Sequence, residues 1–289
     1  MKLYYRELTS DDIPAVKDIS KDIWDGYDYV PDVVEEWLQE KNCMNYGTFK
    51  DEQKTDMVGF GRVKLYNKDL AWLEGGRIRV SCQRQGIGRK QLGYAIEYAY
   101  KAGAKVAQFD TSSKNYGSVS LAEYYGFKRK KSMNVLDADR SDIKLIGSTS
   151  LKFEKITPSE AKNAYKNFDI GPGEEICMGW SYFPLRKISD ENGVWYIHNS
   201  DVILQKIYIN ASPNQESPRE DELWIITYGK PQKAYEAIQN VLQEELKNEK
   251  IKHFEVFCSP ETANLVENLG FSYYEGEPFG VVLYEKKLD

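Results

Sequence analysis

The sequence predicts an α/β fold with a mixed β-sheet, divided into two similar domains. Within residues 78–103 a β-branched run breaks at two closely spaced glycines and restarts as an amphipathic helix, which is the pattern of a strand, a tight turn and a helix. The pattern of residues 3–12 and 108–127 returns at residues 151–161 and 254–271. A chain of 289 residues is long enough for two domains of about 145 residues, each with its own core.

The first elements are predicted to be a strand at residues 3–8, a helix at 13–23 and a second helix at 33–41. The loop between these two helices is aromatic and acidic. We expect three of its residues, Tyr27, Asp28 and Tyr29, to form a wall of a substrate site. The alternative is a packed connection whose tyrosines bury their rings and expose their hydroxyls.

Three strands follow, at residues 45–50, 57–66 and 69–80, and the short polar turns between them predict an antiparallel meander. The helix after Gly88 leads into a short apolar strand at residues 105–110. Because a β-α-β crossover joins the two strands on either side of this helix, we expect them to be parallel. A last helix in this half is expected within residues 115–127.

The turn before the long helix is predicted to bind an anion. Residues 85–88 occupy the first helical turn, where backbone N–H groups have no partner within the helix. Gly86 and Gly88 lack Cβ atoms, so the backbone can approach a diphosphate closely, and Arg84, Arg89 and Lys90 add positive charge. The alternative is a tight turn whose basic residues face solvent.

Two common phosphate motifs do not fit this turn. A dinucleotide-binding GxGxxG would need glycine where Gln91 stands, and a Walker P-loop would need Lys and Ser or Thr where Tyr94 and Ala95 stand.

Composition narrows the class of partner. The net charge is −6, with acidic and basic residues interspersed, so nucleic acid is not expected as the main partner. The four cysteines are widely spaced, without CxxC or paired histidines, and indicate neither a metal site nor disulfides. The start of the chain has no apolar targeting run, and no apolar stretch approaches the roughly 20 residues of a membrane span. We expect a cytoplasmic protein that is a monomer or homodimer and binds no membrane.

Two motifs resemble those of the GCN5-related N-acetyltransferase (GNAT) superfamily. Residues 83–88, QRQGIG, resemble its Q/R-x-x-G-x-G/A signature, and residues 115–127 resemble its N-x-x-A-x-x-L-Y-x-x-x-G-F pattern in the Asn, the length and the closing Gly-Phe. The resemblance implies tandem GNAT-like domains with acetyl-CoA as co-substrate and its pyrophosphate on the glycine turn. The residues it implies for acetyl-CoA binding are Ile78, Arg79, Val80, Gln83, Arg84, Gln85, Gly86, Ile87, Gly88, Arg89 and Asn115.

Roughly residues 1–135 are also similar to the vertebrate histidine N-acetyltransferase group. That group carries a D-Y-[VL]-P loop and an E-G-x-R-V strand, which are matched here by residues 28–31 and 74–78. The chain departs from the group at Val80, where proline is common, and at Gln83, where the group has Arg. The similarity implies acetyl transfer to a small amine, most simply an amino acid. A peptide or protein acceptor and a non-catalytic acyl-CoA-binding module are the alternatives.

Acetyl transfer requires an acceptor amine that has lost its proton, so a base is needed. Glu74, on the strand before the turn, is the predicted base; its alternative role is an ion pair with Arg77 or Arg62, in which case the base would be Asp28, Asp110 or a water chain. The tyrosine that protonates the leaving thiolate in much of the family is replaced by Ala122. Tyr124 is the first candidate for that acid, and release of the thiolate without a protein acid is the alternative.

The pattern loses its strands from about residue 137 to residue 150, which predicts a linker between a catalytic domain at residues 1–140 and a second domain at residues 148–289. In the second domain no glycine pair precedes the helix at residues 232–247. We therefore expect this domain to be degenerate, without a phosphate-binding turn. We also expect the first domain to form its turn without residues 148–289.

Overall fold

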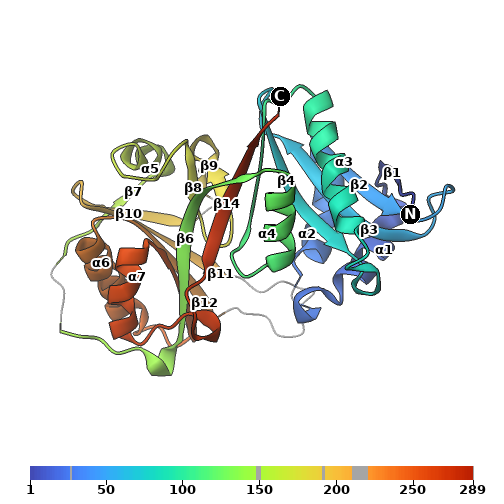
Figure 1. Ribbon diagram of the computed structural model, residues 1–289. Coiled ribbons are helices and arrows are strands. Elements are labelled where there is room, and N and C mark those ends of the chain that lie inside the picture. The colour runs from blue at the N-terminus through green and yellow to red at the C-terminus, as the bar shows by residue number, and fades with distance from the viewer. Residues whose placement is uncertain (27, 148–150, 191–192, 210–220, 289) are drawn as a thin grey trace.

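A computed structural model describes residues 1–26, 28–147, 151–190, 193–209 and 221–288. One twelve-stranded sheet runs through the whole molecule, and a separate two-stranded sheet lies beside it (Figure 1). The strand order of the large sheet is β1-β2-β3-β4-β5-β14-β6-β13-β12-β11-β10-β7. The predicted fold class, α/β with a mixed sheet, is confirmed.

The first half contains the elements in the predicted order. The strands β2, β3 and β4 form the antiparallel meander, and β5 is parallel to β4, as the sequence predicts. The elements are β1 (Tyr4–Glu7), α1 (Ile13–Ser20), α2 (Val30–Gln39), β2 (Cys43–Phe49), β3 (Met57–Leu65), β4 (Leu70–Ile78), α3 (Ile87–Lys101), β5 (Val106–Ser112), α4 (Tyr116–Tyr124) and β6 (Lys128–Asp139).

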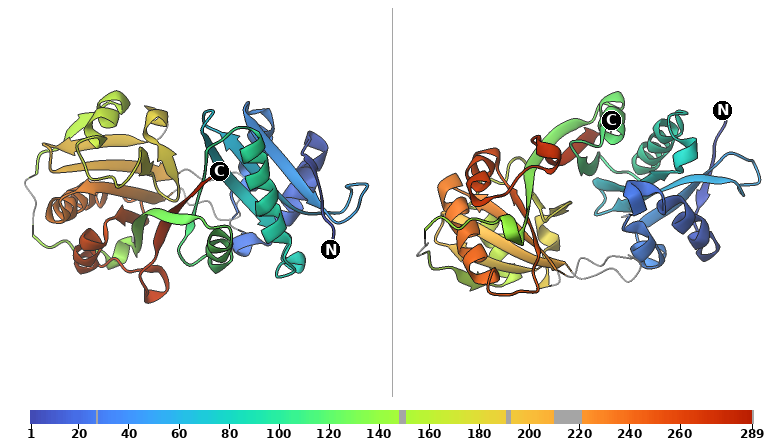
Figure 2. Two further views of the ribbon diagram at one scale, coloured as in Figure 1. Left: turned by 45° about the horizontal axis from the view of Figure 1, so that its top comes forward. Right: turned by 90° about the horizontal axis from the view of Figure 1, so that it is seen from below.

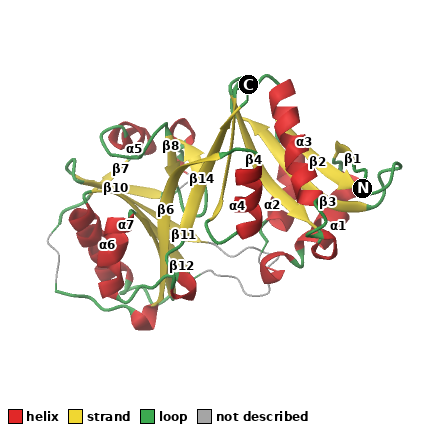
Figure 3. Cartoon of the chain, in the orientation of Figure 1, coloured by secondary structure: helices red, strands yellow, loops and turns green. Residues whose placement is uncertain are grey.

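The second half repeats the strand-helix-strand crossover of the first, with α6 joining the parallel strands β12 and β13. Its elements are β7 (Glu154–Ile156), α5 (Pro158–Tyr165), β8 (Glu175–Cys177), β9 (Tyr182–Pro184), β10 (Val194–His198), β11 (Val202–Ile209), β12 (Glu222–Gly229), α6 (Pro231–Glu245), β13 (His253–Cys258), α7 (Pro260–Val266) and β14 (Gly280–Lys287). Helices α3 and α4 lie against the sheet of the first half, and α6 and α7 against that of the second (Figure 3). None of the helices in the described part of the chain is long and apolar enough to span a bilayer.

The two halves exchange a strand. The last strand of the chain, β14, lies between β5 and β6 and pairs with both, while β6 lies between β14 and β13. Figure 2 shows these two strands crossing between the two lobes. The predicted linker is therefore too long at its start, because β6 continues through Asp139, which pairs with His253. The strand pattern is hard to see there because residues 137–139 are polar.

Each core contains side chains from the other half. Val282 and Tyr284 of β14 belong to the core beneath α3, and Trp72 of β4 belongs to the core of the second half, together with Met133 and Val135 of β6. Removal of residues 148–289 would leave the backbone edges of β5 and β6 unpaired in the middle of the sheet. Because the two halves exchange strands, we now expect the glycine turn to need residues 148–289 in order to form.

We predict that Val282→Asp lowers the free energy of unfolding by about 3 kcal/mol or more, because Val282 is 1% exposed and no partner is provided for a carboxylate there. Both halves should melt in one shifted transition, measured by circular dichroism. Lys287→Asp, at the exposed end of the same strand, is the control and should change stability little. Two separate transitions, with the second half unaffected, would contradict the interlocked fold.

Candidate active site

The parallel strands β4 and β5 separate where the candidate site begins. They pair only at Leu70–Val106, Ala71–Ala107 and Trp72–Gln108, although β4 runs on to Ile78 and β5 to Ser112. Beyond the last pair the facing backbone edges are open to another hydrogen-bonding chain. This opening lies at the carboxyl ends of the strands, where ligands bind in open α/β sheets.

The glycine turn lies at the end of β4 and is shaped to present N–H groups. Gly86 is the N-cap of α3 with φ of +76°, a left-handed conformation that other residues adopt at a cost, and no side chain caps the helix. The backbone N–H groups of residues 85–88 meet no acceptor among the described residues. Gln83 donates to the carbonyl of Ile78 at 3.2 Å, and Gln85 to that of Ser81 at 3.1 Å, so both amides stabilise the turn.

The basic side chains around the turn differ in whether another residue of the protein binds them. Arg84 is exposed, and the guanidinium of Arg89 lies 4.9 Å from the ring centre of Tyr124. The guanidinium of Arg79 instead binds Asp18 at 2.5 Å, so its side chain is directed away from the turn. Val80 is 47% exposed, as a residue beside a ligand site can be. The turn therefore combines free N–H donors with positive charge.

The end of helix α4 lies near this turn. Asn115 caps α4, because its Oδ1 accepts the N–H of Ser118 at 3.2 Å. Ala122, where the resemblance would imply a tyrosine, is fully buried in the core with Phe127. Tyr124 is 61% exposed, and Tyr125 donates to the carbonyl of Arg89 at 2.7 Å, which fastens α4 to the first turn of α3.

The aromatic and acidic loop is held by a buried ion pair. Arg77 binds both carboxylate oxygens of Asp28, with Nε–Oδ2 at 2.9 Å and Nη2–Oδ1 at 2.8 Å. The guanidinium also lies 4.3 Å from the ring centre of Trp24 and 5.5 Å from that of Tyr29. Both oxygens of Asp28 are thus engaged by the protein, and the side chains of Trp24 and Tyr29 are exposed in part, 52% and 42%. Tyr27 lies outside the described residues.

Glu74 has the ion-pair partner that the sequence offered as an alternative. Arg62 Nη1 lies 3.1 Å from Glu74 Oε1, and the same guanidinium binds Glu40 and lies 4.7 Å from the ring centre of Trp37. The Glu74 Oε1 atom is buried and makes no hydrogen bond of good geometry among the described residues. Burial raises the pKa of Glu74, and the Arg62 charge lowers it. Its predicted role as base stays a prediction.

A second carboxylate, Asp110 on β5, lies on the same face as Glu74. The last backbone pair between β4 and β5 is Trp72–Gln108. Glu74 follows Trp72 by two residues and Asp110 follows Gln108 by two, so the parallel register places the two carboxyl groups opposite each other. Ser181 Oγ donates to Asp110 Oδ2 at 2.7 Å and the Tyr182 N–H donates to the same oxygen at 2.6 Å. The pKa of Asp110 is raised to about 7, mainly by burial and also by the Glu74 charge, and these two hydrogen bonds act in the opposite direction.

The contribution of Ser181 and Tyr182 was missed by sequence analysis. Residues 179–182 carry no motif, and they lie about 70 positions after Asp110, so no local spacing signals the contact. Only the fold of the second half brings them to the end of β5.

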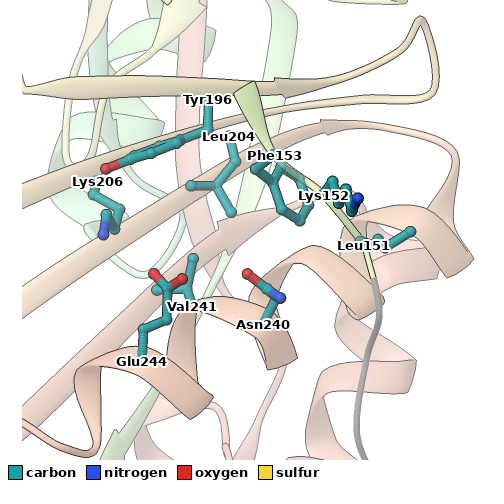
Figure 4. Close-up of a pocket in the computed structure, with 9 residues that line it drawn as sticks. All are labelled: Leu151, Lys152, Phe153, Tyr196, Leu204, Lys206, Asn240, Val241 and Glu244. Atoms are coloured by element: carbon teal, nitrogen blue, oxygen red, sulfur yellow. The ribbon is translucent and has the colours of Figure 1, made fainter. Parts of the chain in front are cut away.

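Two pockets among the described residues lie away from these carboxyl groups, and β6 lines one of them together with the second half. One, of about 240 Å³, lies at the carboxyl ends of β12 and β13. The other, of about 400 Å³, lies between β10, β11 and α6 (Figure 4). Figure 4 shows Tyr196 and Leu204 facing Asn240 and Glu244 of α6 across this space. Neither pocket includes Glu74 or Asp110, and no glycine pair precedes α6. Within the described residues no cluster of His, Cys, Asp and Glu could hold a metal ion.

Comparison with known proteins identifies the fold. Residues 13–127 match the model of the acetyltransferase (GNAT) family. No curated protein matches the sequence.

Three solved structures resemble nearly the whole chain. A GCN5-related glucosamine N-acetyltransferase region of a fungal multi-domain GH3 β-N-acetylglucosaminidase is 15% identical with a TM-score of 0.65; the match covers 98% of this chain, which spans only 38% of that protein. A tandem GNAT protein from the clavulanic acid biosynthesis pathway is 13% identical with a TM-score of 0.62, over 99% of this chain and 98% of that one. A putative acetyltransferase from Pyrococcus horikoshii is 14% identical with a TM-score of 0.60, over 99% and 90%. These likenesses show that the chain shares its fold with these proteins, one of which is described as a tandem GNAT protein.

The glycine turn generates a test of anion binding. We predict that Gly88→Glu weakens acetyl-CoA binding about 100-fold, because a carboxylate would stand at a helix N-terminus that favours anions. Gly88→Gln adds the same bulk without charge and should weaken it less. A Cβ at position 88 meets only ordinary contacts, at 3.6 Å from Leu121 and 3.7 Å from Ile78, so both variants should fold. Equal affinities of the two variants, measured by calorimetry, would contradict an anion site.

Proposed function

Because residues 13–127 match the model of the acetyltransferase (GNAT) family, we propose that this protein transfers an acetyl group from acetyl-CoA to the amine of a small molecule. One observation carries the proposal. Backbone N–H groups with no partner among the described residues lie at the glycine turn after β4, and two carboxyl groups lie on the facing strands where β4 and β5 separate. The first is suited to a diphosphate and the second to an ammonium group.

The glycine turn would hold the diphosphate of acetyl-CoA. Its N–H groups and the charges of Arg84 and Arg89 supply donors and attraction, and the open edge of β4 can pair with an amide-rich arm. The residues proposed for this role are those predicted from the sequence. Among them Arg79 would contribute through its backbone, because its guanidinium binds Asp18, and Asn115 through its place at the start of α4.

The acceptor would lie on the side of the carboxyl groups. An ammonium group must lose a proton before its nitrogen can attack the thioester, so Glu74 and Asp110 are the candidates for the base. Tyr29 is the proposed aromatic wall. Tyr124 is the proposed acid for the leaving thiolate, which its exposure and its place beside Arg89 support.

An amino acid is the first acceptor to consider, because of the resemblance to the histidine N-acetyltransferases. An amino sugar is the next, because the fungal relative is described as a glucosamine N-acetyltransferase region. A peptide or protein N-terminus is the runner-up. A non-catalytic acyl-CoA-binding module is the competing class, and the buried Ala122 in place of the family tyrosine is its main support.

The proposal also assigns different roles to residues 1–140 and to residues 148–289. The first region would bind acetyl-CoA, and the second, without a glycine pair before α6, would be degenerate as an acetyl-CoA site. Neither region is complete alone, because each receives a strand from the other.

We predict that the protein releases free thiol from acetyl-CoA when an acceptor amine is present. The measurement is colorimetric detection of the thiol with a panel of amino acids, amino sugars, polyamines and short peptides, and Gly88→Glu is the control for turnover outside the site. Tight binding of CoA with no thiol release from any amine would favour the binding module. Faster turnover of peptides than of all free amines would favour the runner-up.

A further inference from the structure

We propose that Asp110 takes the proton from the acceptor amine and that Ser181, from the second half of the chain, is the positioning residue that holds its carboxylate. This inference rests on the proposed acetyltransferase function and adds to it the identity of the base and a role for the second half. It is carried by the contacts around the two carboxyl groups at the opening between β4 and β5.

The two carboxyl groups differ in their surroundings. Glu74 faces the guanidinium of Arg62 at 3.1 Å, a cation that would repel an approaching ammonium group and disfavour protonation of Glu74. Within the described part of the chain no cation forms an ion pair with Asp110. Its hydrogen-bond donors, the Ser181 hydroxyl and the Tyr182 N–H, are neutral. An ammonium group is therefore attracted to Asp110 more strongly than to Glu74.

The titratable groups that face Asp110 come from four parts of the structure. They are Glu74 on β4, Tyr29 from the loop before α2, Tyr66 at the end of β3, and Cys177 and Tyr182 on β8 and β9. None carries a positive charge, and Glu74 carries a negative one when ionised. The surroundings hold the pKa of Asp110 near neutral pH, where a carboxyl group can both accept and release a proton.

The hydrogen bonds of Asp110 leave one of its oxygens for the substrate side. Both donors from the second half reach Oδ2, so Oδ1 is the oxygen that can accept a proton. Asp110 itself remains partly accessible to solvent, whereas Gln108, two residues earlier on the same face, is buried and bonded to Glu175 and Glu285. The open end of β5 thus begins at Asp110.

The turn that carries Ser181 is fixed to the second half. Gly179 has φ of +79°, and a Cβ there would lie 2.3 Å from Trp224, so the turn fits closely against β12. Trp180 donates from Nε1 to Glu255 at 2.8 Å and packs edge-on against Phe257 of β13. Ser181 is therefore presented to Asp110 by a rigid support, as a positioning residue requires.

The ammonium group of the acceptor gives one proton to Asp110 Oδ1, and the nitrogen lone pair forms a bond to the thioester carbonyl carbon of acetyl-CoA. The carbon–sulfur bond breaks, and the electron pair leaves on the CoA sulfur. A second proton from the nitrogen passes to that sulfur through Tyr124 or water, and Asp110 then releases its proton to solvent. The products are the N-acetylated amine, CoA thiol and one free proton.

The test compares variants of the full chain by the pH dependence of kcat/KM with an accepted amine. Asp110→Asn should lower kcat/KM at neutral pH by about 10²–10⁴-fold while leaving acetyl-CoA affinity nearly unchanged. A base works only when deprotonated, so activity should rise with pH as Asp110 loses its proton. Ser181→Ala removes a hydrogen bond that lowers the pKa of Asp110, so it should move this rise about one pH unit upward.

Matched variants separate this role from a structural one. Ser181→Thr keeps a hydroxyl and should restore the wild-type profile, and Ser159→Ala, an exposed serine on α5, should not shift it. Because the same amine is used throughout, its own titration is the same in every pH profile. A difference between two profiles therefore comes from the substitution in the protein. Glu74→Gln should lower the melting temperature through loss of its pairing with Arg62.

Three results are decisive. Wild-type protein that turns over no amine would overturn the proposed function. Active protein in which Asp110→Asn is nearly as fast as wild type would overturn only the inference, as would a Ser181→Ala profile that is lowered at every pH without a shift. A large loss in Glu74→Gln that shrinks at high pH, with normal melting, would assign the base to Glu74 instead.

Discussion

The structure depends on the placement of β14 between β5 and β6. Every residue of β5 pairs with β14, whereas on its other edge β5 pairs with β4 at three positions and then departs. The borrowed strand thus holds β5 in place where β4 no longer does. The strand β5 can separate from β4 and still stay ordered. Along its other edge, all of its residues pair with β14, the last strand of the chain. Asp110, which pairs with Leu283, is carried by this supported segment.

The ion pairs of Arg62 and Arg77 affect the charge at the opening between β4 and β5. Arg62 and Arg77 lie near the acceptor side, and each is bound by carboxylates, Arg62 by Glu40 and Glu74 and Arg77 by Asp28. The attraction within a buried ion pair is largely offset by the cost of removing both charges from water. The contribution of these pairs here is that they fix the loop and the strands in one geometry. These cations are paired with carboxylates, whereas the hydrogen-bond donors to Asp110 are neutral, as the proposed cationic acceptor requires. The positive charges of Arg84 and Arg89 remain at the glycine turn, where an anion is expected.

Much of the first half could be predicted because its signals are local. The glycine turn, the meander and the crossover each depend on residues within about 30 positions of one another. The exchange of β6 and β14 could not be predicted, because the period of a strand says which face is buried but not which strand lies beside it. The same holds for Ser181 and Asp110, and for Asp28 and Arg77, 49 positions apart. The pairing of Glu74 with Arg62 was one of two alternatives, and only the register, which shifts between Phe60 and Arg62, places them opposite each other.

The most direct measurement of the interlocked sheet is native-state hydrogen exchange. If β14 holds the two halves together, the buried amides of β5, β14, β6 and β13 open only when the whole chain unfolds, so they should share one free energy of exchange equal to the global free energy of unfolding. That value should fall equally at all four strands when β14 is destabilised. Amides of β4 and β5 that exchange through a smaller opening of their own, independent of β13 and β14, would contradict this account and would make the first half a separate folding unit.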